Sequence, residues 1–303
     1  MDQLRGVWES LAPRATIFQR FDWNHRAACI FGSREAPFIV VAESDSGVAL
    51  IPACIDSAHK RISLLGEELF DYRDILSEGD ESNARAAWEP VLELADANGY
   101  DLRFHSLRGG DPEEWFGLKK KCFTAAPHLL SADTAEFHHP RLGLNLRRLE
   151  RKGAQLATRT GSDENFLRRL YSLKAQEAGS LFADPLRIEM LIAMACSAAT
   201  TCEVYALEEG SVLIAALVTF RDGNWRRFYT TYYNESWARY SPGLTLLHEV
   251  VRQSLDGGLD CDFMTGDQPY KRRLATSSTP LYRIHATSGE LRGMLAQSSA
   301  QVA

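Results

Sequence analysis

A short run near the C-terminus gathers side chains that can move protons and hold charge. Asp267, Tyr270 and Lys271 lie close together, and Arg272 and Arg273 follow directly. The Tyr270 phenol could donate a proton to a leaving thiolate, and the Lys271 ammonium could stabilise a developing oxyanion. Asp267 either joins this chemistry or only neutralises an arginine on a solvated loop. Asp267, Tyr270 and Lys271 are therefore candidate catalytic residues, and a solvated polar loop is the alternative.

A second candidate lies upstream, where Pro242-Gly243 opens a predicted helix after Ser241. Proline at a helix start has a preset φ and loses no needed hydrogen bond, and Ser241 suits the N-cap position. Small residues here would let a ligand approach backbone N–H groups at the positive end of the helix dipole, which is a diphosphate-binding geometry. The alternative is an ordinary capped helix, since such starts are common.

Two residues are candidates for a general base, Glu177 and His248. His248 stands at helical spacing from Leu244 and Val251, so packing is the more natural role for it. The strand-like segment 225–233 is dense in aromatic residues, among them Tyr232 and Tyr233. Such residues either line an acceptor pocket or belong to the core, and the sequence leaves both open.

The elements that must position these residues recur in the two halves of the chain. The first half reads as helix 17–31, strands 37–43, 48–55 and 61–65, helix 81–98 and strand 100–107. The second half reads as strand 154–160, helices 163–179 and 185–199, strands 202–208, 211–221 and 225–233, helix 244–255 and strand 259–264. Each half thus contains a three-strand meander, a helix and a strand, which indicates an internal duplication.

Helices that alternate with a mixed, mainly antiparallel sheet place the fold in the α/β (α+β) class. We expect two similar domains, residues 1–140 and 141–303, joined near a helix over 142–152. At 303 residues the chain is long enough for two domains.

Composition excludes several classes of protein. The net charge of −6 disfavours a large nucleic-acid footprint, so we expect no DNA partner. The N-terminus lacks the apolar region of a signal peptide, and no apolar stretch is long enough for a membrane span. The six cysteines show no CxxC spacing, which favours reduced thiols, a cytoplasmic location and no structural metal. Serine-hydrolase elbows, Walker loops and dinucleotide fingerprints are missing from the sequence.

Taken in order, the motifs resemble a known family. The segments 238–244 and 262–273, supported by Asp71-Tyr72-Arg73-Asp74, Asn145-Leu146-Arg147-Arg148 and Phe182-Ala183-Asp184-Pro185, resemble the CelD-like (BioF2-like) acetyltransferases. These belong to the GNAT superfamily and are similar to the Fem peptidoglycan aminoacyltransferases, which carry two GNAT domains. The C-terminal block is specific, and the other segments are weak singly.

The resemblance implies acyl transfer from a thioester, acetyl-CoA or another acyl-CoA, to a small-molecule, glycan or peptide amine. The thioester would lie where strand 225–233 splays from strand 259–264. Catalysis would belong to the second domain, and the first would help to form the acceptor cleft. The resemblance implies donor-binding residues at Arg239, Tyr240, Ser241, Gly243, Leu244 and Thr245. From their residue types we expect Tyr232, Tyr233 and Glu177 to bind the substrate. The chain departs from the usual glycine-rich loop, because only Gly243 follows Arg239 and Pro242 lacks an N–H.

Two rival hypotheses remain at this stage. One is an aminoacyl-tRNA-dependent transferase of the Fem kind, against which the acidic net charge counts. The other is a degenerate GNAT pair that serves as a binding module without catalysis. The sequence reveals neither the acceptor nor the acyl chain length nor the oligomeric state.

Overall fold

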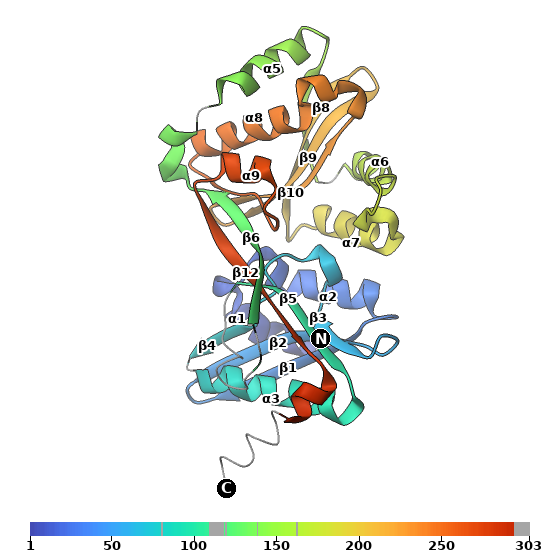
Figure 1. The fold of residues 1–303 in the computed structure, drawn as a ribbon, viewed down its shortest axis with the longest axis vertical. Coiled ribbons are helices and arrows are strands. Elements are labelled where there is room, and N and C mark those ends of the chain that lie inside the picture. The colour runs from blue at the N-terminus through green and yellow to red at the C-terminus, as the bar shows by residue number, and fades with distance from the viewer. Residues whose placement is uncertain (80, 109–117, 119, 138, 162, 294–303) are drawn as a thin grey trace. The chain divides into compact units, whose positions relative to one another are not determined.

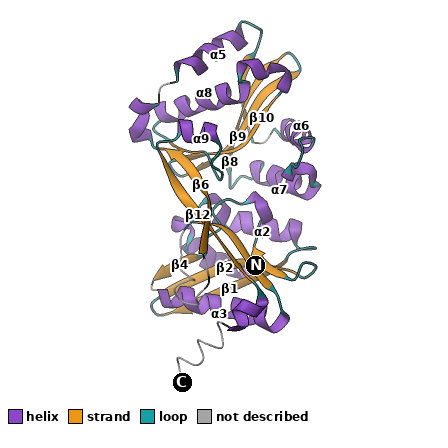
Figure 2. Cartoon of the chain, in the orientation of Figure 1, coloured by secondary structure: helices purple, strands orange, loops and turns teal. Residues whose placement is uncertain are grey.

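The computed structural model describes residues 1–79, 81–108, 118, 120–137, 139–161 and 163–293. The chain divides into two compact units, the first made of Met1–Thr124 with Pro280–Ala303 and the second of Ala125–Thr279 (Figure 1). This division differs from a single boundary at 140/141, because the last strand of the chain, β12 (Ser277–Ala286), pairs with β5 (Asp101–Leu107) of the first unit. A mixed sheet flanked by helices confirms the predicted fold class (Figure 2).

The first unit carries a sheet in the order β1-β2-β3-β5-β12, and β4 also pairs with β2. Its elements not yet named are α1 (Arg5–Ser10), α2 (Phe21–Phe31), β1 (Ala36–Ser44), β2 (Gly47–Asp56), β3 (Arg61–Leu64), β4 (Leu76–Gly79) and α3 (Glu81–Asn98). Successive residues of a strand face opposite sides. Ile51 therefore packs with α3 on one face, and Leu50 packs with Trp8 and Phe21 of α1 and α2 on the other.

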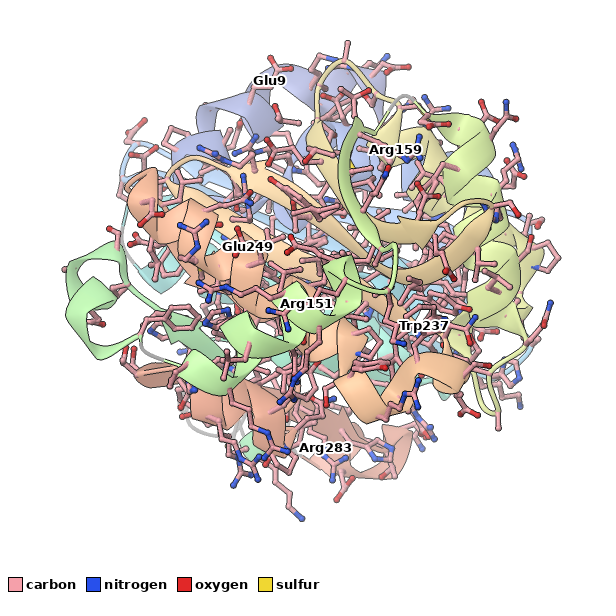
Figure 3. The ribbon with its side chains drawn as sticks, turned by 90° about the horizontal axis from the view of Figure 1, so that it is seen from above. Glu9, Arg151, Arg159, Trp237, Glu249 and Arg283 are labelled. Atoms are coloured by element: carbon pink, nitrogen blue, oxygen red, sulfur yellow. The ribbon has the colours of Figure 1, made fainter. Side chains whose placement is uncertain are left out.

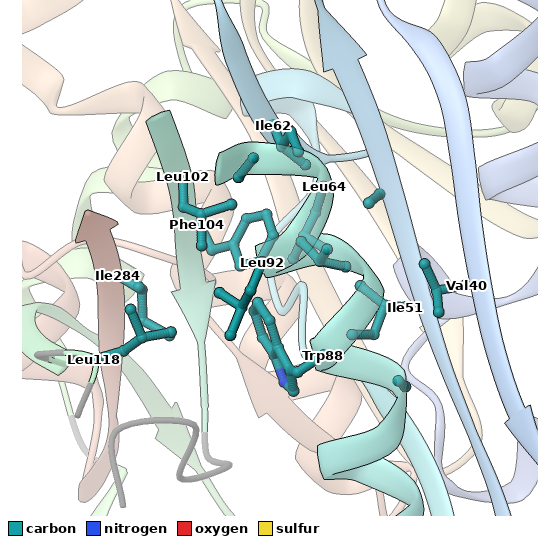
Figure 4. Packing of buried hydrophobic residues seen from close by; sticks show 14 of the residues in the cluster. Val40, Ile51, Ile62, Leu64, Trp88, Leu92, Leu102, Phe104, Leu118 and Ile284 are labelled. Atoms are coloured by element: carbon teal, nitrogen blue, oxygen red, sulfur yellow. The ribbon is translucent and has the colours of Figure 1, made fainter. Parts of the chain in front are cut away.

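The α3 side of this sheet holds the larger core. Trp88 and Leu92 project from α3 onto Leu64, Leu102 and Phe104, as Figure 4 shows. The Trp88 and Phe104 ring centroids are 4.9 Å apart. The helix over 81–98 is predicted correctly because its apolar side chains follow the helical period and Gly99 ends it with a positive φ of 65°.

The second unit carries a sheet in the order β6-β11-β10-β9-β8-β7. Its strands are β6 (Lys120–Leu129), β7 (Gln155–Thr160), β8 (Thr201–Glu209), β9 (Val212–Asp222), β10 (Trp225–Tyr233) and β11 (Asp260–Asp262). Its α-helices are α5 (Pro140–Glu150), α6 (Glu164–Ala175), α7 (Pro185–Ala195), α8 (Pro242–Asp256) and α9 (Pro269–Leu274). The apolar face of α8 packs on β8 and β9, and α5 lies against α8 (Figure 1).

The duplication predicted from the sequence is visible in the strand pairing of each unit. In the first, β1, β2 and β3 form an antiparallel meander, and β5 returns parallel to β3 after α3. In the second, β8, β9 and β10 form the meander, and β11 returns parallel to β10 after α8. Both units therefore contain one parallel pair at the equivalent place.

Besides the short β4, two strands were not predicted from the sequence, β6 and β12. Each contains a proline, Pro127 or Pro280, and proline inside a run argues against a strand because it lacks an N–H. Their pairing is crossed with respect to chain order, since β6 pairs with β11 and β12 pairs with β5. Each strand therefore forms its hydrogen bonds with a strand that is far away in sequence. Local sequence patterns do not reveal such pairing.

Other boundaries shift by a few residues. The helix expected over 17–31 is split into a short 3₁₀ turn, Ile17–Gln19, and α2, because Arg20 is extended with a ψ of 154°. Asp163 caps α6 as predicted, with its side chain accepting from the N–H of Phe166. The six cysteines are free, and three of them, Cys54, Cys202 and Cys261, are buried.

Candidate functional site

The site begins where β11 leaves β10. The two strands pair in parallel only from Trp225–Asp260 to Arg227–Asp262. A β-bulge follows at once in β10, between Phe228 and Thr230, and a bulge bends the strand that carries it. On the other strand the chain turns at Met264, which has a positive φ of 63°. The last six residues of β10 thus extend beyond the paired region.

Buried ion pairs fix the point at which the strands part. The Arg227 guanidinium lies between Asp222 and Asp262, and all three side chains are almost fully buried. Arg226 donates to Glu203 at 2.5 Å and to the Ser254 hydroxyl at 3.0 Å. Removing one partner of such a buried pair is strongly destabilising, because a buried charge is left uncompensated. We infer that Arg227 anchors the paired end of the two strands.

The start of α8 presents a small number of free amides. The N–H of Thr245 donates to the carbonyl of Ser241, which is the first bond of the helix. Pro242 has no N–H. The amides of Gly243 and Leu244 therefore come before this first helical bond and have no acceptor within the helix. Ser241 occupies the N-cap position, but its side chain makes no capping bond and its φ is 49°. Ser241 is therefore the N-cap residue, as predicted, although it caps the helix without a side-chain hydrogen bond.

A cavity of about 300 Å³ lies at this helix start. It is walled by the end of β10, by the residues before and within the first turns of α8, and by α9; its lining residues are Thr231, Tyr233, Ala238, Ser241, Pro242, Gly243, Leu244, Leu247 and Tyr270. We call it the helix-start cavity. Gly243 faces Tyr233 here, and a β-carbon on Gly243 would stand 3.4 Å from the Tyr233 β-carbon.

Tyr270 reaches this cavity from α9, the short helix that replaces the loop expected from the sequence. Its side chain lines the cavity together with Thr231. Burial raises the pKa of Tyr270 above its ordinary value, although the nearby Thr231 side chain opposes the shift. A phenol with a raised pKa stays protonated at neutral pH, so it can donate.

Lys271 and Asp267 lie elsewhere. The Lys271 ammonium is buried and donates to the carbonyl oxygens of Thr265 at 2.8 Å and Met264 at 3.4 Å. Asp267 is exposed and forms an ion pair with Arg272. Neither side chain lines the helix-start cavity. Lys271 holds the loop that follows β11, and Asp267 makes the surface pair that the sequence offered as its alternative role.

A second cavity of about 650 Å³ lies beside the first. Thr231 and Tyr233 line both cavities, so the end of β10 forms a wall common to the two. The remaining lining residues are Leu173, Lys174, Gln176, Glu177, Ala178, Tyr232, Asn234 and Glu235. We call it the polar cavity. It brings together Glu177, Tyr232 and Tyr233, the residues expected from the sequence to bind substrate.

Charge in the polar cavity is set by Glu177 and its neighbours. The Lys174 ammonium binds the Glu177 carboxylate at 2.6 Å. Burial raises the pKa of Tyr232, and the negative charge of Glu177 adds to the shift. Glu235, on the 3₁₀ helix Glu235–Tyr240, supplies a second carboxylate to the lining.

The remaining predicted residues surround the start of α8 without lining either cavity. The Arg239 guanidinium lies over the Tyr240 ring, 4.7 Å from its centroid. Trp237, which is labelled in Figure 3, packs against the same ring at 5.9 Å. Thr245 is buried and donates its hydroxyl to the carbonyl of Tyr240 at 3.3 Å. His248 stacks on Phe137 at 5.0 Å, which agrees with a packing role.

Sequence reasoning missed Thr231, although a signal for it exists. Thr231 and Tyr233 are two residues apart on a strand and therefore share a face. Lys174 and Glu235 of the polar cavity were also missed, because they come from a helix end and a 3₁₀ turn that only the fold brings together. Among the described residues, no group of His, Cys, Asp or Glu side chains could hold a metal ion. In the same residues, no helix is long and apolar enough to cross a membrane.

Comparison with known proteins agrees with this architecture. Residues 141–272 match the family model of the acetyltransferase (GNAT) domain. None of the curated protein sequences matches the chain significantly.

Three solved structures resemble the chain over most of its length. Their sequence identities to the chain are low, so the likeness shows a common fold only. FemX is 10% identical with a TM-score of 0.61, covering 93% of this chain and 95% of FemX. L-PGS from Bacillus licheniformis is 14% identical with a TM-score of 0.57, covering 86% and 90%. The tandem GNAT protein from the clavulanic acid biosynthesis pathway is 13% identical with a TM-score of 0.56, covering 95% of each chain.

The splayed parallel strands, the helix start beside them and the matched family model point to one fold. Residues 141–272 match the acetyltransferase (GNAT) domain, and the chain as a whole shares the fold of a tandem GNAT protein.

Proposed function

We propose that the protein is an N-acyltransferase that moves an acyl group from an acyl-CoA to an amine. One observation carries this proposal: the end of β10 is a common wall of two cavities, and the protonated phenol of Tyr270 stands in one of them. A donor and an acceptor held on either side of this wall would meet at Thr231 and Tyr233. Holding two reactants so close removes much of the entropic barrier to their reaction.

The helix-start cavity has the character that a CoA thioester requires. The amides of Gly243 and Leu244 and the positive end of α8 suit a pyrophosphate. Leu244, Leu247 and Tyr233 give the cavity an apolar wall for the pantetheine arm. Gly243 leaves the helix start open, since a larger side chain would meet Tyr233. We therefore assign Ser241, Gly243 and Leu244 to donor binding, with acetyl-CoA or a longer acyl-CoA as donor.

The polar cavity suits an amine acceptor. Glu177 and Glu235 offer carboxylates to an ammonium group, and Tyr232 and Tyr233 offer ring faces and hydroxyls to its body. Lys174 neutralises part of this charge, because it is paired with Glu177. We assign Glu177, Tyr232 and Tyr233 to acceptor binding, and the acceptor is a small-molecule, glycan or peptide amine.

The chemistry follows from these positions. The amine nitrogen attacks the thioester carbonyl, so a C–N bond forms and the C–S bond breaks. Tyr270 gives its phenol proton to the leaving sulfur, and Glu177 or water takes the proton that the amine loses. Backbone N–H groups on the splayed part of β10 are suited to the oxyanion. Lys271 supports the reaction indirectly, by holding the loop after β11.

Titration calorimetry with acetyl-CoA and longer acyl-CoAs, followed by an assay of free thiol release with pooled amines, tests the proposal. We expect saturable binding of at least one acyl-CoA and amine-dependent thiol release. Absence of both would overturn the proposal. If aminoacyl-tRNA binds instead, with an affinity that falls steeply with salt, the donor is a tRNA.

A further inference from the structure

The first unit contains a counterpart of the strand pair that parts in the second. β3 and β5 run parallel and pair from Arg61–Asp101 to Ile62–Leu102, and β5 continues to Leu107. This is the place at which β10 and β11 part in the second unit. Two equivalent positions in a duplicated fold raise the question of whether each takes an acyl donor.

Arg73 ties the two strands together at this place in the first unit. Its Nη2 donates to the carbonyl oxygen of Leu64, at the end of β3, at 2.6 Å. Its Nη1 lies 3.1 Å from Nε2 of His105, on β5. Its backbone N–H donates to the carbonyl of Ser106, also on β5, at 3.0 Å. The side chain is 4% exposed, so one guanidinium spans from strand to strand inside the unit.

The imidazole of His105 responds to the buried guanidinium of Arg73. The charge of Arg73, burial and the charge of Arg61 lower the pKa of His105 to about 3. His105 is therefore neutral at physiological pH, so its Nε2 can accept a hydrogen bond from Arg73. Ser106 carries a positive φ of 63°, a conformation that costs free energy and persists only where the surroundings enforce it.

The apolar residues that precede Arg73 in sequence are packed in the interior of the first unit. Leu69, Phe70 and Tyr72 are buried, and they come from the segment between β3 and β4. Phe70 and Tyr72 pack on Phe18 with ring centroids 5.9 and 6.4 Å away. In the second unit the equivalent connection, from Asn234 to Ser241, instead borders the helix-start cavity with Ala238 and Ser241.

We infer that Arg73 closes the parted strands of the first unit, so that the chain takes one acyl donor, in the second unit. This inference rests on the proposed function for its donor. Arg73 excludes the thioester because it occupies, with hydrogen bonds to both strands, the position that the acyl group would need. The first unit is thereby committed to a role other than donor binding.

Calorimetry on the full chain with coenzyme A and acetyl-CoA tests the stoichiometry. We expect saturation at one molecule per chain. Hydrogen exchange should slow on binding within residues 225–271 and stay unchanged within 61–64 and 101–107. Two molecules per chain, or ligand-dependent protection of 101–107, would overturn the inference.

Arg73→Met tests the closure itself without any donor, with Arg85→Met on the exposed face of α3 as its control. Losing both side-chain bonds should speed exchange of the amides of 62–66 and 102–107 by about tenfold, as expected when local opening becomes easier. Exchange as slow as in Arg85→Met would show that Arg73 does not hold the strands. If Arg73→Met does not fold, Arg73→Lys takes its place, because lysine keeps the positive charge but lacks the forked guanidinium. Its amide exchange rates are then compared with those of Arg85→Met. Failure to bind any acyl-CoA would refute the proposed function, while the exchange result would still decide the role of Arg73.

Discussion

Tyr270 and Thr231 line the helix-start cavity together, although 38 residues of sequence separate them. Thr231 belongs to the wall between the helix-start cavity and the polar cavity. The proton donor of the proposed reaction therefore lies beside the strand along which donor and acceptor would meet.

Tyr270→Phe should lower kcat by about 10²- to 10⁴-fold, the usual contribution of a general acid. Acyl-CoA affinity should change little, because the ring remains. Thr231→Val should lower kcat less, and Thr231→Ser should restore it. In the unaltered protein the alkaline loss of activity should lie above pH 10, since the pKa of Tyr270 is raised from 10.0. Initial rates of thiol release across pH measure this, and a Tyr270→Phe enzyme with full kcat would clear Tyr270 of the role.

Gly243→Val should weaken acyl-CoA binding at least about tenfold, which is about 1.4 kcal/mol. The new side chain would start 3.4 Å from the Tyr233 β-carbon and extend into the helix-start cavity. Gly143→Val is the matched control, because Gly143 is also in a helix of this unit and has no atom within 4 Å of an added β-carbon. Calorimetry should show a lower acetyl-CoA affinity for Gly243→Val than for Gly143→Val. Equal affinities would show that the donor does not bind at the start of α8.

Glu177→Lys should raise the KM for the amine by about tenfold while leaving the acyl-CoA Kd unchanged, because a cation would face a cationic substrate. Glu209→Lys, at the end of β8 and outside the lining of both cavities, serves as the control. Steady-state kinetics at saturating donor measure the effect. A rise in the acyl-CoA Kd with no change in the amine KM would instead place the donor in the polar cavity.

Acid should destabilise the fold through His105. Its folded pKa is about 3, against 6.5 ordinarily, so between these values the unfolded chain binds a proton that the folded chain does not. Stability is therefore lost as the pH falls below 6.5, by up to about 1.4 kcal/mol per pH unit. His105→Gln, whose amide oxygen can still accept from Arg73, should flatten this part of the pH dependence. Urea unfolding between pH 7 and pH 4 measures it, and parallel curves would contradict the assignment.

Ile284→Ala should destabilise the protein by about 2–5 kcal/mol, the usual cost of truncating a buried isoleucine. Ile284 is 1% exposed on β12 and packs in the core of the first unit. Thr279→Ala, at a partly exposed position of the same strand, should change the stability by less than about 0.5 kcal/mol. Equal unfolding midpoints in urea would show that β12 contributes little to that core.

The strands and helices were largely predictable because their signals are local. The pattern over 225–233 gives the observed bounds of β10, and Pro242-Gly243 marks the observed start of α8. The family resemblance rests on the same local runs, and the matched GNAT model confirms it. Donor-binding and substrate-binding residues remain predictions, although Tyr233, Ser241, Gly243, Leu244 and Tyr270 do share one cavity.

What the sequence alone determined is the repeated order of elements, the GNAT resemblance and the segments in which the chemistry lies. Only the tertiary structure decided which side chains of those segments face the cavities. Tyr270 and Lys271 are neighbours in sequence, yet α9 directs the phenol toward Thr231 and the ammonium toward the carbonyls of Met264 and Thr265. Side-chain direction depends on backbone turns such as Met264 and on partners distant in the chain, and a linear pattern of residue types contains neither.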